Sequence, residues 1–203
     1  MTSDPRIPRA TTAPPAATPL SKADLRKHLL GIRRTLDAAT RAAWDAAIGR
    51  HVLAWSEAAA VDALGVYWPL RDEPNLQAAY GELARRGVRL LLPVVVEKHA
   101  PLAFADWRIG EAMVKDGMGV AVPADLRLAP RPAALLVPCL GYNGHGYRLG
   151  YGGGFYDRTL AAQPRPRTVG VAYACQQADF GDDPHDIALE RIVTELGTAT
   201  PGA

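Results

Sequence analysis

Val88-Arg-Leu-Leu-Leu-Pro-Val-Val-Val96 is the stretch that decides the fold class of this 203-residue chain. It is apolar at almost every position instead of alternating, so it predicts a strand that is buried on both faces. Ala133-Ala-Leu-Leu-Val-Pro-Cys139 has the same character and predicts a second buried strand. Strands of this kind are typical of a parallel sheet that carries helices on both faces.

Helical patterns precede and separate the strands. Ser21 is a favourable N-cap, and apolar residues then recur at helical spacing from Leu25 to Leu36. We further expect helices from about Ala39, over 73–86 and over about 154–163, and strands over 61–68, 102–107, 168–173 and near Ile192. Residues 110–131 are expected to be irregular, because glycine and proline punctuate them. Strands that alternate with helices predict an α/β fold, with a mostly parallel sheet flanked by helices.

The length favours one sizeable domain, because two domains of half this size would have thin cores. Residues 1–20 are rich in Pro, Thr and Ala and lack apolar periodicity, so they are predicted to be a disordered extension. The single domain is expected over residues 21–197. Residues 198–203 are expected to form a flexible tail.

Composition excludes several classes of partner. Hydrophobic residues make up 48% and charged residues 22% of the chain, and the net charge is only +2. Neither nucleic acid nor a membrane is therefore expected as the main partner. No apolar stretch reaches the about 20 residues of a membrane span, and the N-terminus lacks a secretory pattern, so a cytoplasmic location is expected. Cys139 and Cys175 show no metal-binding or disulfide spacing. A small-molecule substrate and a monomer or small homo-oligomer are the remaining expectation.

Arg148-Leu-Gly-Tyr-Gly-Gly-Gly-Phe-Tyr-Asp157 carries the clearest chemical pattern. Glycines between a strand and a helix let the backbone approach a ligand and offer N–H groups to an anion. Arg148 could hold phosphate oxygens, and Asp157 supplies a carboxylate of the kind that binds Mg²⁺. The stretch matches neither a Walker A loop nor a dinucleotide fingerprint. Read alone, it is equally consistent with a tight strand-to-helix connection.

Three further groups of residues invite a functional interpretation. Lys22, Arg26 and Arg33 lie within about 40° of one another on a helical wheel, so they form either a cleft-facing stripe or a solvated basic face. Glu73 follows a predicted strand and could accept hydrogen bonds from a heterocycle or begin a helix. Asp186 is a candidate second carboxylate near a metal, whereas the neighbouring His185 is more consistent with a structural role.

Taken together, these motifs resemble the 5-formyltetrahydrofolate cyclo-ligase family, also called 5,10-methenyltetrahydrofolate synthetase. The resemblance extends over most of residues 21–195. It includes Lys22-Ala-Asp-Leu-Arg26, Glu73-Pro74, Leu135-Leu-Val-Pro-Cys-Leu-Gly-Tyr142, the Arg148–Asp157 segment, His185-Asp186 and Thr194-Glu195. It implies an α/β fold similar to that of sugar-phosphate isomerases and CoA transferases. It also implies conversion of 5-formyltetrahydrofolate to 5,10-methenyltetrahydrofolate with ATP and Mg²⁺, without a covalent nucleophile.

The resemblance also implies roles for individual residues. Arg148 would be the main catalytic side chain, and the ATP-binding set would be Lys22, Arg26, Arg148, Gly150, Tyr151, Gly152, Gly153, Gly154 and Tyr156. The folate would contact Glu73, Met118, Tyr151 and Phe155, and Mg²⁺ would bind Asp157 and Asp186. The chain departs from the family pattern at Met118, where an aromatic residue is frequent, at Asn143, where Asp is usual, and at Gly153, where some members carry Lys.

Two other functions remain open at this point. One is a sugar-phosphate isomerase or CoA-transferase type of enzyme on the same scaffold, which would not require ATP. The other is a folate- or nucleotide-binding paralogue that senses or stores its ligand without turnover, an idea favoured by Asn143 and Met118.

Overall fold

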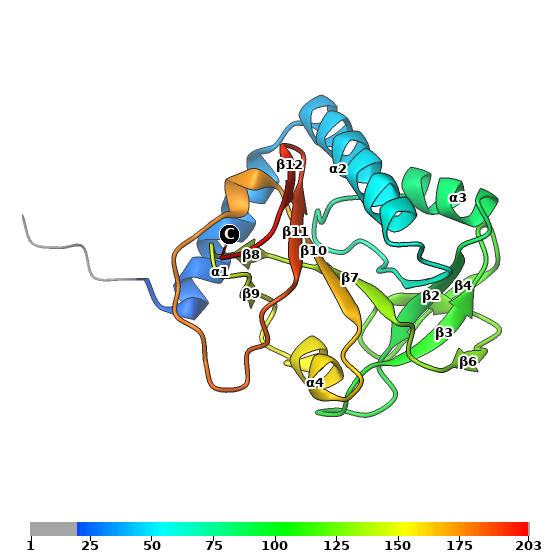
Figure 1. Cartoon of the computed structure of the whole chain (residues 1–203). Coiled ribbons are helices and arrows are strands. Elements are labelled where there is room, and N and C mark those ends of the chain that lie inside the picture. Colours follow the sequence, from blue (N-terminus) through cyan, green and yellow to red (C-terminus); the bar gives the residue numbers. More distant parts are fainter. Residues whose placement is uncertain (1–19, 203) are drawn as a thin grey trace, which may run out of the picture.

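The structure, a computed structural model, describes residues 20–202 (Figure 1). The predicted disordered extension over 1–20 therefore lies almost entirely outside the described residues. At the centre is an eight-stranded sheet in the order β12-β11-β10-β7-β1-β2-β3-β6. Its strands are β1 (Ala63–Gly65), β2 (Arg89–Val94), β3 (Ala103–Trp107), β6 (Leu128–Ala129), β7 (Ala134–Pro138), β10 (Arg167–Val171), β11 (Arg191–Thr194) and β12 (Gly197–Ala199).

The inner strands β11, β10, β7, β1 and β2 pair in parallel, whereas β12, β3 and β6 pair antiparallel toward the two edges. This arrangement confirms the predicted α/β class with a mostly parallel sheet. Since β1 lies between β2 and β7, the chain leaves β1 and β7 toward opposite sides of the sheet. Ligands of open α/β sheets bind at the carboxyl ends of strands at such a point.

Helices cover the two faces of the sheet because successive strand residues point to opposite sides. Helices α2 (Ala38–Ala58) and α3 (Gln77–Arg85) cover one face, and α4 (Phe155–Ala161) covers the other (Figure 1). In β2, Leu90 and Leu92 belong to the core beneath α2 and α3, while Leu91 belongs to the core that includes Leu160 of α4. The unbroken apolar run of this strand is the direct result of burial on both faces.

Helix α1 (Lys22–Thr35) does not cover the sheet. Its N-cap is Ser21, as predicted, and the Ser21 side chain accepts a hydrogen bond from the Asp24 N–H. Leu25 and Leu29 pack against Leu140 and Leu149 at the small sheet formed by β8 (Gly141–Tyr142) and β9 (Arg148–Leu149). Because β8 follows β7, α1 lies beyond the carboxyl end of that strand (Figure 1).

The chain between β1 and α3 differs from the sequence prediction. The strand predicted over 61–68 ends at Gly65, and the helix predicted from Glu73 begins at Gln77. The loop folds on itself instead, because the Tyr67 hydroxyl donates to the Pro74 carbonyl oxygen at 2.7 Å. Glu73 is thereby turned inward, and the prediction that it begins the helix was wrong.

Two further segments are more ordered than predicted. Residues 110–131, expected to be irregular, contain the hairpin of β4 (Met113–Lys115) and β5 (Ala121–Pro123), followed by β6. Residues 198 and 199, expected in a flexible tail, belong to β12 and pair with β11. Strands of two or three residues are too short to leave a periodic signal. Within residues 20–202, no helix combines the length and the apolarity that crossing a membrane requires.

Candidate ligand-binding site

A cavity of about 520 Å³ opens at the carboxyl ends of β1, β2 and β7. Its walls come from the loop after β1, the segment after β9, the start of α1 and the loop before β11. All the site residues proposed from the sequence line it: Lys22, Arg26, Glu73, Met118, Arg148, Gly150, Tyr151, Gly152, Gly153, Gly154, Phe155, Tyr156, Asp157 and Asp186. The structure thus gathers residues that lie up to 164 positions apart. Their individual roles stay predictions.

The glycine-rich loop joins β9 to α4 along one wall of this cavity. Gly152 and Gly154 have φ values of 90° and 64°, which side-chain-bearing residues rarely adopt. Gly154 is also the N-cap of α4, close to the predicted start of that helix. Within residues 20–202, the N–H groups from Tyr151 to Gly154 donate no hydrogen bond. They remain available for ligand oxygens, as in backbone anion-binding nests.

Arg148 is the most informative side chain of the site. Only 7% of its side chain is exposed, and its Nη2 forms an ion pair with Asp157, with Oδ2 at 2.8 Å. The guanidinium also lies 5.7 Å from the centre of the Tyr156 ring. Its Nη1 is buried and has no hydrogen-bond partner among residues 20–202. A buried donor without an acceptor costs about 1–3 kcal/mol, and a ligand oxygen in the cavity would remove that cost.

Helix α1 presents two residues of its basic stripe, Lys22 and Arg26, to the cavity, whereas the third, Arg33, is buried and does not line it. Lys22 Nζ lies 2.7 Å from Asp183 and 2.9 Å from Asp186, and Arg26 Nε donates to the Gly150 carbonyl at 2.8 Å. Burial alone would lower the pKa of Lys22, but its two hydrogen bonds to the aspartates raise the pKa overall. The amino end of α1 is therefore a cationic wall of the cavity.

The carboxylates proposed for Mg²⁺ lie on the same side of the cavity. Asp157 Oδ1 accepts from the Ile187 N–H at 3.4 Å, which brings it close to Asp186. Burial would raise the pKa of Asp186, but hydrogen bonds from Asp183 N–H and Lys22 lower it, so it stays ionised. Within residues 20–202, no cluster of three or more His, Cys, Asp or Glu side chains could hold a metal. Two carboxylates do fit a Mg²⁺ ion whose other ligands are phosphates and water.

Glu73 lies at the inner end of the cavity and is only 4% exposed. Its two oxygens accept from the Leu70 N–H at 2.8 Å and from the Tyr151 hydroxyl at 3.0 Å. Burial raises the pKa of Glu73, and these two hydrogen bonds together with the nearby Arg33 charge offset part of the rise. The remaining lone pairs of the carboxylate can accept from a donor-rich ligand.

Apolar side chains make the rest of the cavity suitable for a flat, largely hydrophobic ligand. Trp68, Leu102 and Phe155 contribute to its walls. Met118 lies at the turn between β4 and β5 and is 59% exposed. The Asp116 carboxylate holds this turn by accepting from the N–H groups of Met118 and Val120.

The sequence interpretation missed Arg71, Trp68 and Asp183, which also line the cavity. Arg71 has a positive φ of 49°, and its guanidinium lies 4.8 Å from the centre of the Tyr151 ring. It belongs to the quoted segment Pro69–Pro74, but charge alone did not distinguish it from a solvent-exposed residue. Asp183, three residues before Asp186, could have been found as a second carboxylate at short spacing.

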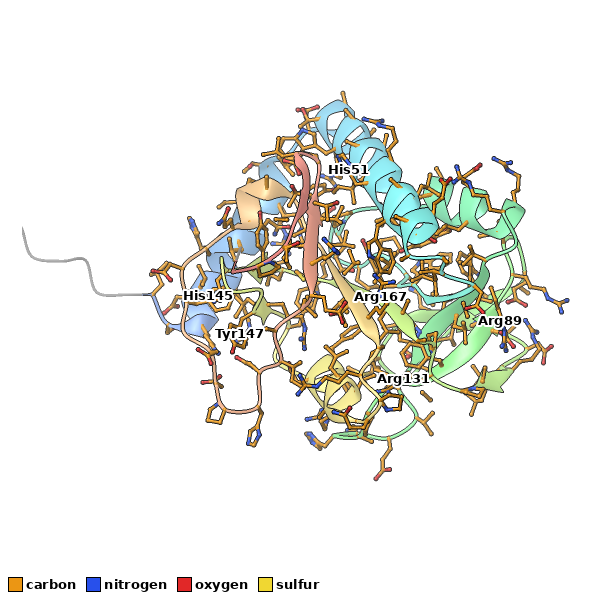
Figure 2. All side chains as sticks on the ribbon, in the orientation of Figure 1. His51, Arg89, Arg131, His145, Tyr147 and Arg167 are labelled. Atoms are coloured by element: carbon orange, nitrogen blue, oxygen red, sulfur yellow. The ribbon has the colours of Figure 1, made fainter. Side chains whose placement is uncertain are left out.

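Asn143, a departure from the family pattern, has a structural role in this chain. Its Oδ1 accepts from the N–H groups of His145 and Tyr147, and its Nδ2 donates to the Phe180 carbonyl. His145 and Tyr147 lie on the turn between β8 and β9 (Figure 2). Because a carboxylate cannot donate, only the amide satisfies all three partners. Asn143 does not line the cavity, so it gives no reason to expect loss of turnover.

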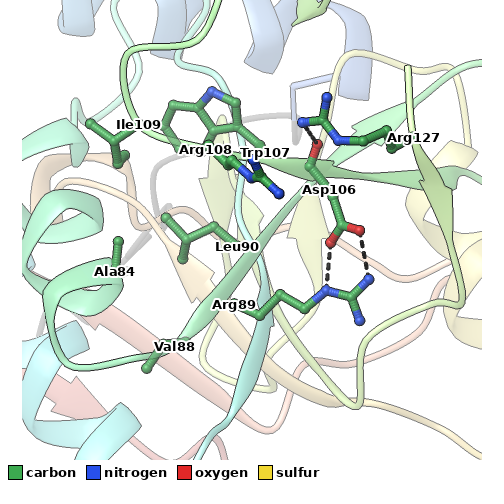
Figure 3. A pocket seen from close by; sticks show the side chains of 9 residues that line it. All are labelled: Ala84, Val88, Arg89, Leu90, Asp106, Trp107, Arg108, Ile109 and Arg127. Carbon is green, nitrogen blue, oxygen red and sulfur yellow. Dashed lines mark hydrogen bonds and ion pairs between the residues drawn. The ribbon is translucent and has the colours of Figure 1, made fainter. Parts of the chain in front are cut away.

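A separate cavity of about 440 Å³ lies at the amino end of β2, beside Val88, Arg89 and Leu90 (Figure 3). It is lined by Arg89, Arg127 and Trp107, among others. Arg89 pairs with Asp106, and Arg127 pairs with Glu111 and Asp125. Both arginines therefore have carboxylate partners, and none of the site residues proposed from the sequence lines this cavity.

The fold and the larger cavity define an α/β protein whose ligand site combines unpaired N–H donors, basic side chains and carboxylates at the carboxyl edge of the sheet. Comparison with known sequences shows to which family within this class the chain belongs. The chain belongs to the 5-formyltetrahydrofolate cyclo-ligase family, whose sequence profile matches residues 19–195.

Individual relatives agree with this membership. The 5-formyltetrahydrofolate cyclo-ligase of Mycolicibacterium smegmatis is 31% identical over 195 residues, which cover 87% of this chain and 95% of the relative. The enzyme of the same name from Mycoplasma pneumoniae is 26% identical over 179 residues and is covered to 99%. Among solved structures, the 5,10-methenyltetrahydrofolate synthetase of Aquifex aeolicus has a similar fold. Its TM-score is 0.78 at 24% identity, and the match covers 90% of this chain and 93% of that one.

Proposed function

We propose that this chain converts 5-formyltetrahydrofolate into 5,10-methenyltetrahydrofolate and consumes one ATP, which leaves as ADP and phosphate. Family membership supports the reaction and the folate substrate. The buried Nη1 of Arg148, which has no acceptor among residues 20–202 and belongs to a residue that lines the cavity, is the single observation that most supports a phosphate site there.

The proposed chemistry proceeds in two steps. The formyl oxygen attacks the γ-phosphorus of ATP, ADP leaves, and an iminium phosphate forms at N5. N10 then attacks the formyl carbon and loses its proton to water or to the departing phosphate. The carbon–oxygen bond breaks, phosphate carries away the former formyl oxygen, and N5 and N10 share the positive charge of the methenyl bridge. The oxygen, a poor leaving group in the formamide, thus becomes a good one. Positioning and charge neutralisation are the tasks left to the protein.

Among residues 20–202, no cysteine lines the cavity, so no thiol there argues for a covalent route. Cys139 is fully buried, and burial raises the pKa of its thiol to about 12, so it stays protonated at neutral pH. A thiol in that state is a poor nucleophile. Cys139 is better explained as a small core residue at the end of β7, as its apolar surroundings predict.

The cavity residues divide between the substrates according to their chemistry. Phosphates suit Lys22, Arg26, Arg148 and the N–H groups of Gly150–Gly154, with Tyr151 and Tyr156 beside them. The pterin suits the Glu73 carboxylate, while Met118, Tyr151 and Phe155 provide surface for the folate rings. Asp157 and Asp186 would hold Mg²⁺, which supplies positive charge to the transferring phosphoryl group.

An absorbance assay for the methenyl product tests the proposed function directly. The full chain, supplied with 5-formyltetrahydrofolate and Mg-ATP, is expected to form the product together with one ADP per turnover. A reaction without ATP, or no reaction with it, would overturn the proposal. Tight folate binding without ADP release would instead identify a non-catalytic binding protein.

The metal assignment predicts a specific change in Asp157→Asn. The amide keeps the shape of the side chain but binds a hard cation more weakly than a carboxylate does. We expect the Mg²⁺ concentration for half-maximal rate to rise about tenfold or more, a loss of about 1.4 kcal/mol in metal binding. Rates measured across a Mg²⁺ titration test this expectation. Asp182→Asn, at an exposed position outside the cavity, serves as the control, and an unchanged titration for Asp157→Asn would refute metal ligation.

We propose that the partners are limited to these small molecules. Charge supports this, because the net value of +2 leaves no large excess of basic residues for nucleic acid or anionic lipid. We also propose a cytoplasmic location and a monomer or small homo-oligomer.

A further inference from the structure

Arg33 is a buried basic residue of α1 to which the proposed function assigns no role. It is fully buried, and it forms no salt bridge within residues 20–202. Its guanidinium donates to the Cys139 carbonyl at 2.8 Å and to Gln176 Oε1 at 2.8 and 3.2 Å. Its Nη1 donates to the Tyr151 hydroxyl at 3.0 Å. Burying a cation costs desolvation free energy. This one connects α1, the end of β7, the 3₁₀ turn η1 (Ala174–Gln176) and the glycine-rich loop.

These contacts fix the direction of the Tyr151 hydroxyl. Arginine can only donate hydrogen bonds, so the Tyr151 oxygen must accept from Arg33. Its own proton is then free for the other partner, Glu73 Oε1, at 3.0 Å. The resulting order of donors runs from Arg33 to Tyr151 to Glu73. Glu73 is thereby surrounded by donors only and keeps its role as an acceptor.

Tyr151 contributes both to the glycine-rich loop and to the surroundings of the Glu73 carboxylate. Its backbone lies in the glycine-rich loop, where its own N–H and that of Gly152 have no partner within residues 20–202. Its side chain meets the carboxylate at the inner end of the cavity. Because the Tyr151 hydroxyl already contacts Glu73, an anion that holds the loop in this conformation would also hold that contact in place. Ordering by one ligand lowers the entropic cost for the second.

We propose that Arg33 is a positioning residue that couples nucleotide binding to folate binding through Tyr151. The proposal rests on the proposed function, since it assigns the loop to ATP and Glu73 to the pterin. Coupling of this kind is reciprocal, so each ligand must tighten the other by the same factor.

Binding of 5-formyltetrahydrofolate, measured by calorimetry with and without the Mg²⁺ complex of β,γ-imido-ATP, tests the proposal. For the unmodified chain we expect the analogue to lower the Kd of the folate by about tenfold. In Tyr151→Phe and in Arg33→Lys that factor is expected to fall to about one. Tyr151→Phe removes a single oxygen, whereas lysine keeps the charge but lacks the planar fork of donors.

The controls separate coupling from stability. Arg34→Lys, an exposed arginine next to Arg33 on the same helix, is expected to retain the full factor. Thermal unfolding shows whether Arg33→Lys is folded; if it is not, Tyr151→Phe alone decides. A general weakening of the fold would raise both dissociation constants and leave their ratio unchanged, so an unchanged ratio in Tyr151→Phe overturns the inference.

The two proposals can fail separately. A chain that forms the methenyl product but shows a coupling factor of one contradicts only the role of Arg33. A chain that never forms the product contradicts the proposed function itself, whatever the binding ratio.

Discussion

Arg148→Ala is expected to lower kcat/KM for methenyltetrahydrofolate formation by about 10²–10³-fold. The guanidinium is nearly buried in the cavity wall, and its Nη1 has no other acceptor within residues 20–202. Alanine removes the donor that would stabilise charge on the transferring phosphoryl group. Initial rates over a range of ATP and folate concentrations measure the loss. A turnover near that of the unmodified chain would exclude the phosphate role.

The Arg148→Ala experiment needs a control for Asp157, because alanine leaves the Asp157 carboxylate without its ion-pair partner at 2.8 Å. Arg148→Lys keeps a positive charge beside Asp157 but cannot contact two oxygens in parallel, so an intermediate loss is expected. Arg165→Ala, at an exposed position between α4 and β10, is the matched control and should keep full activity. Thermal unfolding of all three variants shows whether lost activity reflects lost structure.

Glu73→Gln is expected to raise the KM for 5-formyltetrahydrofolate by about 10- to 100-fold, the range for lost hydrogen bonds to a charged group. The two carboxylate oxygens already accept from Leu70 N–H and the Tyr151 hydroxyl. An amide offers one acceptor oxygen and places its NH₂ group against one of these donors. The KM for ATP should change little, and an equal rise in both KM values would count against a folate-specific role.

The pH dependence of the same variant adds an independent measurement. Burial raises the pKa of Glu73, so on acidification it is protonated at a higher pH than an exposed glutamate. As the pH is lowered, folate affinity should therefore begin to decline at a pH above 4.5, the ordinary pKa of Glu. Glutamine does not titrate, so this decline should be absent in Glu73→Gln. Glu190→Gln, at an exposed position beside the amino end of β11, should retain it.

The elements that could be predicted from the sequence are those with a local signal. The apolar run at β2 and the Ser21 cap report on neighbouring residues, and both were confirmed. The glycines at 150–154 likewise marked a backbone turn. The short strands β4, β5 and β12 were missed, because pairing with distant strands stabilises them more than their own pattern does.

The hydrogen bonds between site residues could not be predicted, because the partners lie far apart in the sequence. Tyr151 reaches Glu73 across 78 positions, and Arg33 reaches Gln176 across 143. No spacing rule connects residues so far apart. Arg33 could be placed on the same helical stripe as Lys22 and Arg26, but whether it faced a ligand or the protein interior depended on how α1 docks. The structure shows that it faces the interior.

The ion pairs of the cavity bear on whether the metal and the nucleotide bind separately or together. Lys22 is neutralised by Asp183 and Asp186, and Arg148 by Asp157. On the proposed function, Lys22 and Arg148 would contact phosphate oxygens of the nucleotide, and the carboxylates released from these pairs would hold Mg²⁺. Free nucleotide would leave the aspartates facing its own negative charge, and free metal would leave the cations unmatched. On that proposal the resting site would favour the metal and the nucleotide as one species, because their joint entry would keep the partly buried charges balanced.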